Sequence, residues 1–178
     1  TSPYAFHQYF LNAEDEMVVA YLKVFSERPR DEIDDIAAQQ AEKPFLRIAQ
    51  RALADDITDL VHGEPERRAA EAAAAALFGR SELRDLDART LAAVAKQLEA
   101  PRLEAGETLP ALVDVLAASG VVPSKSAGRR AIEEGGAYLN NVKVTDVDAV
   151  LTQDDLLDGR WAVVRRGKKT VGAVEVVR

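Results

Sequence analysis

Helix-forming sequence fills the first hundred residues of this chain, and β-forming sequence appears only in roughly the last forty. Before residue 100, apolar residues recur at helical spacing and the breaks fall at proline or glycine. The clearest helix is expected to open at Pro44 and stop at Gly63, and its apolar face is Phe45, Ile48, Ala49, Ala52, Leu53, Leu60 and Val61. Ser81 and Asp87 can each cap a further short helix. The first part is therefore predicted to be a helical bundle without strands.

The pattern changes after residues 104–108, where Gly106 and charged residues predict a linker. We expect two helices next, at 109–118 and after a cap at Ser124 or Ser126. Runs rich in β-branched and aromatic residues follow at 137–140, 142–144, 161–164 and 170–177. The predicted fold is α+β, with a helical domain over residues 1–103 and a small module of two helices and a sheet over 109–178.

Composition excludes several classes of site. The chain has no cysteine, which rules out disulfides, thiolate nucleophiles and cysteine-bound zinc and is compatible with the cytoplasm, where we expect the protein. No apolar run approaches the ~20 residues that span a bilayer, so no membrane partner is expected. The first residue is Thr1 rather than methionine, and we therefore expect a fragment or a processed chain.

Charge is distributed unevenly along the sequence. The net charge is -7, but residues 109–178 contain ten Lys or Arg against nine Asp or Glu, so the excess of acid lies in residues 1–108. A local basic patch can bind phosphate on an acidic protein, because potentials decay over roughly 10 Å in moderate salt. The C-terminal module is thus the better candidate for a polyanion.

The first candidate motif runs from Ser124 to Asn141. Lys125, Arg129 and Arg130 fall within two turns of a predicted helix, where they could meet a phosphate backbone near the helix N-terminus. Gly135 and Gly136 then stop the helix before a hairpin whose Asn-Asn turn tolerates positive φ. The alternative is an ordinary solvated helix with surface arginines.

The second motif is a run of like charges between two apolar strands. Arg165, Arg166, Lys168 and Lys169 surround one glycine, where they repel one another and contribute nothing to the fold. Such a hairpin tip is suited to binding phosphates, because each neutralised phosphate releases counterions. The alternative is a turn that only improves solubility.

These motifs resemble a known RNA-binding module. The pattern Ser-Lys-Ser-x-x-Arg-Arg-x-Ile-x-x-Gly-Gly-x-x-x-Asn, from Ser124 to Asn140, is similar to a module shared by a ribosomal small-subunit protein, pseudouridine synthases and bacterial tyrosyl-tRNA synthetases. Residues 1–12 and 52–63 resemble the segment after the catalytic loop and the helical anticodon domain of those synthetases, and residues 165–169 resemble their C-terminal hairpin. Two departures are Gly128, where the family usually has Ala, and Asn141, where it usually has Gly.

The resemblance implies the tRNA-binding part of a tyrosine–tRNA ligase. The implied partner is tRNA(Tyr), held at its anticodon stem-loop and variable arm, and the implied parent enzyme is a homodimer through a catalytic domain that uses ATP with Mg²⁺. No catalytic residue, cofactor or metal is expected in this segment: neither His7 nor His62 lies in a catalytic signature, and Ser124-Lys125-Ser126 only imitates one. The alternative is an rRNA- or ribosome-associated protein that uses the same module.

Two groups in the helical region are ambiguous. Asp55, Asp56 and Asp59 could suggest a metal site, but their spacing favours a solvated helix face. Arg28, Arg30 and Arg47 are weaker candidates for contact with the anticodon arm.

Overall fold

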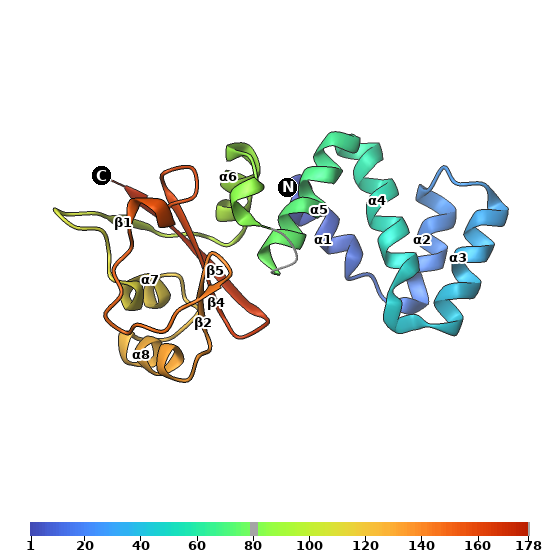
Figure 1. Ribbon diagram of the computed structural model, residues 1–178. Coiled ribbons are helices and arrows are strands. Elements are labelled where there is room, and N and C mark those ends of the chain that lie inside the picture. Colours follow the sequence, from blue (N-terminus) through green and yellow to red (C-terminus); the bar gives the residue numbers. More distant parts are fainter. Residues whose placement is uncertain (79–81, 178) are drawn as a thin grey trace. The chain divides into compact units, whose positions relative to one another are not determined.

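A computed structural model describes residues 1–78 and 82–177 (Figure 1). The chain forms two compact units, one from Thr1 to Glu71 and the other from Ala72 onward. Ser81, expected to cap a helix, lies outside the described residues. No helix in the described part is both long enough and apolar enough to cross a membrane.

The first unit is made of helices α1 (Pro3–Leu11), α2 (Asp15–Phe25), α3 (Arg30–Glu42), η1 (Pro44–Leu46), α4 (Ile48–His62) and the start of α5 (Glu64–Leu77). The central helix α4 packs against α1, α2 and α3. Its buried residues Ala49, Ala52 and Leu53 meet Val18, Leu22, Ile33 and Ile36 in one core. The helix expected to open at Pro44 is interrupted, because Arg47 is left-handed (φ 53°) between the 3-10 turn η1 and α4.

The second unit is a five-stranded sheet with helices. In chain order it contains η2 (Leu83–Asp85), α6 (Ala88–Gln97), β1 (Arg102–Glu104), α7 (Leu112–Ala118), α8 (Lys125–Glu133), β2 (Ala137–Leu139), β3 (Val142–Lys143), η3 (Gln153–Asp155), β4 (Trp161–Arg166) and β5 (Thr170–Val177). The strand order is β1-β5-β4-β2-β3. Among the strand pairs of the described residues, β1 and β5 are parallel and the others are antiparallel. The α+β class predicted from the sequence is confirmed.

Successive side chains along each strand point to opposite faces of the sheet, and the two faces have different surroundings. Ala137, Ala162, Val164, Val174 and Val176 are buried in one core with the apolar residues of α7 and α8. Their neighbours Tyr138, Val163, Arg165, Ala173 and Glu175 lie on the other face, because successive side chains of a strand alternate. The second helix begins as expected at Ser124, whose hydroxyl accepts a hydrogen bond from the Ala127 amide.

The end of the segment predicted to be helical and the start of the expected linker take part in the sheet. Arg102–Glu104 pairs with Glu175–Val177, and the Ala105 amide donates a hydrogen bond to the Val177 carbonyl. A three-residue strand with charged residues at both ends gives no β pattern, so only its partner defines it. The compact units therefore divide near Glu71, and the functional boundary at 104–108 stays a prediction.

Candidate nucleic-acid interface

The hairpin of β4 and β5 presents the densest group of cations. Its last paired residues are Arg166 and Thr170, and Gly167 opens the turn with φ 63°. Arg166, Lys168 and Lys169 are exposed. In the part of the chain that the structure describes, no ion pair joins any of these three to a carboxylate. The tip is thus an uncompensated positive patch, as a phosphate-binding surface requires.

Arg165 differs from its three neighbours in being half-buried and held in place. Its guanidinium lies 4.2 Å from the ring centre of Tyr138, a cation–π stack. One of its terminal nitrogens donates a hydrogen bond to the Gly167 carbonyl. Arg165 and Arg166 are consecutive in a strand and therefore project to opposite faces of the sheet.

The hairpin tip meets the turn that follows α8. The Gly167 amide donates a 2.8 Å hydrogen bond to the Gly136 carbonyl. Gly135 ends the helix with φ 70°, and a Cβ added there would lie 2.7 Å from the Lys143 ammonium. Lys143, which sequence reasoning did not select, therefore lies beside the same turn. Its position depends on strand register, because Lys143 pairs with Tyr138 and Tyr138 with Arg165.

Carboxylates neutralise part of the positive charge of α8. The Lys125 ammonium lies 2.6 Å from Asp114, and Arg129 lies 3.2 Å from Asp148. Arg130 is exposed, and it has no ion pair among the described residues. Solvent-exposed ion pairs of this kind contribute about 0–1 kcal/mol, so a phosphate could replace either carboxylate. Lys125 and Arg129 share one side of the helix, since they are four residues apart.

Two further arginines of the sheet are neutralised at the Glu175 carboxylate. Arg160 and Arg102 lie 2.6 and 3.0 Å from its oxygens. Hydrogen bonds from Arg160 and then Arg102 hold the pKa of Glu175 below its usual value. Arg160 also stacks on Trp161, with 4.4 Å between the guanidinium and the ring centre. The positive charges in this part of the sheet are thus balanced by a carboxylate, whereas those of the hairpin tip are not.

The three aspartates of α4 do not form a solvated face. Asp55 contacts His7, Asp56 binds Arg28 through both oxygens at 2.8 and 2.9 Å, and Asp59 lies 2.8 Å from Arg67. Each carboxylate thus ties α4 to another segment of the unit. The expectation of a solvated face was wrong, because the partners His7, Arg28 and Arg67 lie on other segments, and helical spacing within α4 cannot show them.

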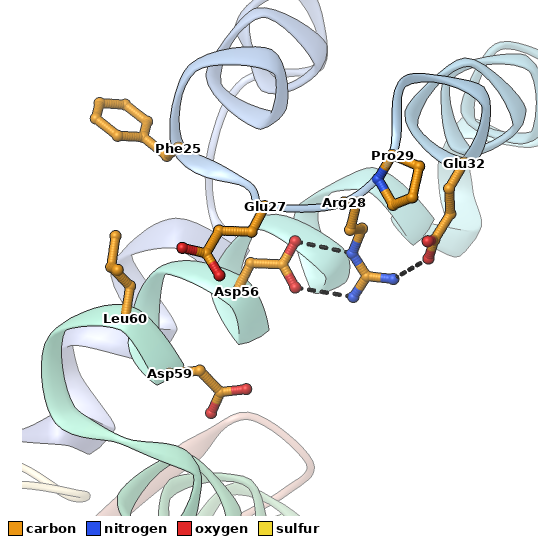
Figure 2. Close-up of a pocket in the computed structure, with 8 residues that line it drawn as sticks. All are labelled: Phe25, Glu27, Arg28, Pro29, Glu32, Asp56, Asp59 and Leu60. Atoms are coloured by element: carbon orange, nitrogen blue, oxygen red, sulfur yellow. Dashed lines mark hydrogen bonds and ion pairs between the residues drawn. The ribbon is translucent and has the colours of Figure 1, made fainter.

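The three arginines considered for contact with the anticodon arm have different partners in the structure. Figure 2 shows Arg28 between Asp56 and Glu32, and the hydrogen bond to Asp56 is the main cause that raises the Arg28 pKa. Arg47 donates to the Leu11 carbonyl. Arg30 is 90% exposed with a 3.8 Å contact to Asp34, so it remains available to a partner.

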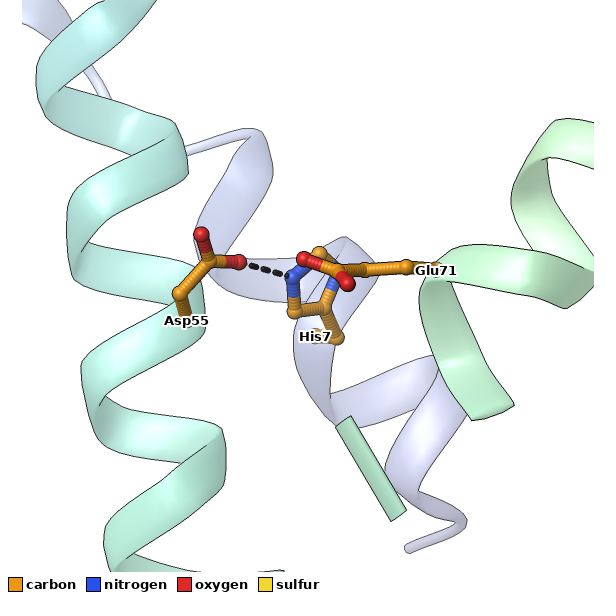
Figure 3. Close-up of side chains that lie close together, drawn as sticks. All are labelled: His7, Asp55 and Glu71. Carbon is orange, nitrogen blue, oxygen red and sulfur yellow. Dashed lines mark hydrogen bonds and ion pairs between the residues drawn. The ribbon is translucent and has the colours of Figure 1, made fainter. Parts of the chain in front are cut away.

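A group that could hold a metal ion lies where α1, α4 and α5 meet. Ligand atoms of His7, Asp55 and Glu71 lie within 4.8 Å of one another (Figure 3). The buried His7 ring is 2.8 Å from Asp55 through Nε2, while Glu71 also accepts a hydrogen bond from Arg67 at 3.0 Å. These contacts join His7 to Asp55 and Glu71 to Arg67, while the buried His7 Nδ1 has no hydrogen-bond partner among the described residues.

Comparison with known proteins covers both parts of the chain. The family described as the tyrosine–tRNA ligase SYY-like C-terminal domain matches residues 92–173, and the class I tRNA synthetases (W and Y) match residues 1–79. A tyrosine–tRNA ligase of Cutibacterium acnes is 62% identical over 98% of this chain and 41% of its own length. One from Thermobifida fusca is 52% identical over 98% of this chain and 40% of its own length.

A solved tyrosyl-tRNA synthetase C-terminal domain is 33% identical with a TM-score of 0.41, over 55% of this chain and 96% of that domain. The chain spans about two fifths of the length of the ligases that it matches.

Proposed function

Because the chain belongs to the bacterial tyrosyl-tRNA synthetases and matches their C-terminal part, we propose that it holds tRNA(Tyr) for the aminoacylation reaction. The helical domain approaches the anticodon stem-loop, and the module over residues 109–178 binds the backbone of the anticodon stem and the variable arm. The observation that carries this proposal is the uncompensated cation cluster at the tip of the β4–β5 hairpin. Contacts of this kind recognise backbone shape more than sequence.

Seven side chains make the proposed RNA contacts. They are Lys125, Arg129 and Arg130 on α8, and Arg165, Arg166, Lys168 and Lys169 at the hairpin. On this proposal the chemistry belongs to the part of the ligases that the chain does not match. Tyrosine activation by ATP with Mg²⁺, and a homodimer interface, are assigned to that catalytic domain, and the protein works in the cytoplasm.

The test replaces Arg165, Arg166, Lys168 and Lys169 with alanine and measures tRNA(Tyr) affinity across a range of salt concentrations. Each lost phosphate contact should reduce the slope of log affinity against log salt by about 0.7–0.9. Arg102→Gln with Arg160→Gln is the matched control, since Glu175 already neutralises both side chains. Unchanged affinity and slope in the hairpin variant would refute the proposal.

A competition measurement separates tRNA from the alternative partner. Unlabelled tRNA(Tyr) should displace labelled tRNA(Tyr) at lower concentration than rRNA fragments do. Preferential displacement by rRNA would instead favour the ribosome-associated function.

A further inference from the structure

The sheet contains two arginine–aromatic stacks that differ in charge balance. Arg160 stacks on Trp161, and its charge is neutralised by Glu175 at 2.6 Å. Arg165 stacks on Tyr138 at a similar distance, but among the described residues its hydrogen-bond partner is the neutral carbonyl of Gly167. Its Nε is buried without a hydrogen-bond partner there. The second stack thus presents an oriented positive charge that no carboxylate satisfies.

This stack lies in a row of side chains across three strands. Tyr138 on β2 pairs directly with Lys143 on β3 and with Arg165 on β4. Directly paired residues project to the same face, and adjacent strands are ~4.8 Å apart. The neighbouring row contains Ala137, which is fully buried in the core. Lys143, Tyr138 and Arg165 therefore lie together on the face opposite α7 and α8.

Lys143 brings a second charge to this row. Its side chain is exposed, and its ammonium lies against Gly135 in the turn after α8. That turn is hydrogen-bonded to the hairpin tip through Gly136 and Gly167. The carboxylates nearest in sequence, Asp146 and Asp148, form no ion pair with Lys143 within 4.0 Å in the described structure, and Asp148 instead pairs with Arg129. The ammonium is thus a free cation beside a basic tip.

We propose that Lys143 and Tyr138 complete a phosphate-binding site for the RNA backbone around Arg165; Arg165 is already a proposed RNA contact, whereas the two sequence motifs give no role to Lys143 or Tyr138. Lys143 and Arg165 contact the phosphate, and Tyr138 is a positioning residue that holds the Arg165 guanidinium toward it. A planar guanidinium fixed against a ring loses less freedom on binding than an unrestrained side chain. This inference rests on the proposed function, in which the chain binds tRNA.

The experiment measures the salt dependence of tRNA(Tyr) binding by the 178-residue chain. Tyr138→Leu removes the ring without changing the charge, and Lys143→Gln removes the second cation. Each should weaken binding and lower the slope of log affinity against log salt by about 1, as expected for one lost phosphate contact. Tyr138→Phe keeps the ring and should bind like the unmodified chain. Adding Arg165→Gln to Tyr138→Leu should weaken binding no further than Arg165→Gln alone.

The controls separate this site from folding and from the proposed function. Arg160→Gln alters the compensated stack and should leave the slope unchanged. Fluorescence of Trp161, the single tryptophan, shows whether each variant keeps its sheet. If Tyr138→Leu fails to fold, the salt slope of Lys143→Gln alone tests the proposed site. The exposed side chain of Lys143 can be changed without disturbing the stack of Arg165 on Tyr138. A normal slope in a folded Tyr138→Leu or in Lys143→Gln overturns the site, whereas an unmodified chain that does not bind tRNA overturns the proposed function.

Discussion

Replacement of Gly172 by alanine should destabilise the second unit, although alanine is among the smallest possible changes. Gly172 lies in β5 opposite Val164, on the face that packs against the end of α7. A Cβ there would lie 2.8 Å from Val121 Cγ1 and 2.9 Å from the Ser119 carbonyl oxygen. The carbonyl belongs to the backbone and cannot rotate away, so the sheet or the helix end must move.

Overpacking of this kind costs about 1–3 kcal/mol. For a unit of roughly 100 residues, each kcal/mol changes Tm by about 4 °C or more, so a decrease of ~4–12 °C is expected. Gly128→Ala is the matched substitution, and it is expected to raise the stability of the second unit instead of lowering it. Its Cβ would meet Val113 O at 3.5 Å and Leu116 Cβ at 3.7 Å, which are ordinary contacts. Removal of a glycine from the interior of α8 should add about 0.5–1 kcal/mol.

The assay follows Trp161 fluorescence during heating. Trp161 is the single tryptophan and is buried in β4, so its signal reports the second unit and not the first. Tm should fall for Gly172→Ala and rise by a few degrees for Gly128→Ala. The reasoning is refuted if Gly172→Ala melts within 1 °C of the unmodified chain, or if the two variants shift in the same direction.

Two further predictions concern charged contacts. Thr90 donates a backbone hydrogen bond to the N-cap carboxylate of α6 and is the main cause that lowers the Asp87 pKa. An N-cap contributes ~1 kcal/mol, and the part of it that depends on the charged carboxylate should be present above pH about 4 and lost as pH falls through the lowered pKa. Unfolding midpoints at several pH values should show the stability deficit of Asp87→Ala shrinking at low pH, whereas Asp87→Asn should keep a neutral cap at every pH; an Asp87→Ala deficit equal at pH 2 and pH 7 would contradict this. In urea unfolding, a double-mutant cycle on the half-buried, two-point Arg28–Asp56 pair should give a coupling of about 1 kcal/mol or more. The exposed Arg30–Asp34 pair should give roughly 0.3, and equal couplings would show that geometry and burial do not matter here.

Local chemistry in the sequence was enough to predict much of the second unit. Ser124 and Asp87 cap helices as expected, because a capping side chain acts on an amide three residues away. The turn at Asn140 and Asn141 has φ of 46° and 68°, which asparagine tolerates. These features depend on residues close together in the chain, so a sequence pattern can show them.

Features that depend on distant residues were missed. The aspartates of α4 find their hydrogen-bond partners on other segments, and β1 becomes a strand only through β5. The row of Lys143, Tyr138 and Arg165 is set by register between three strands, and a shift of one residue would place them on the other face. A search for paired positions across the predicted hairpin could have suggested Tyr138 with Lys143 but not Tyr138 with Arg165, because β2 and β4 are not adjacent in the chain.

The position of β5 also has a kinetic consequence. This strand follows all the others in the chain, yet it lies between β1 and β4 in the sheet. Its pairing with β1 closes a loop of about 70 residues, and such non-local closure slows folding, whereas the helical first unit forms from nearer contacts. The basic tip joins β4 to β5, which are adjacent in the chain, so the hairpin itself can pair without β1. The RNA surface should consequently begin as a local hairpin and be fixed in the sheet only when the slower pairing of β5 with β1 closes it.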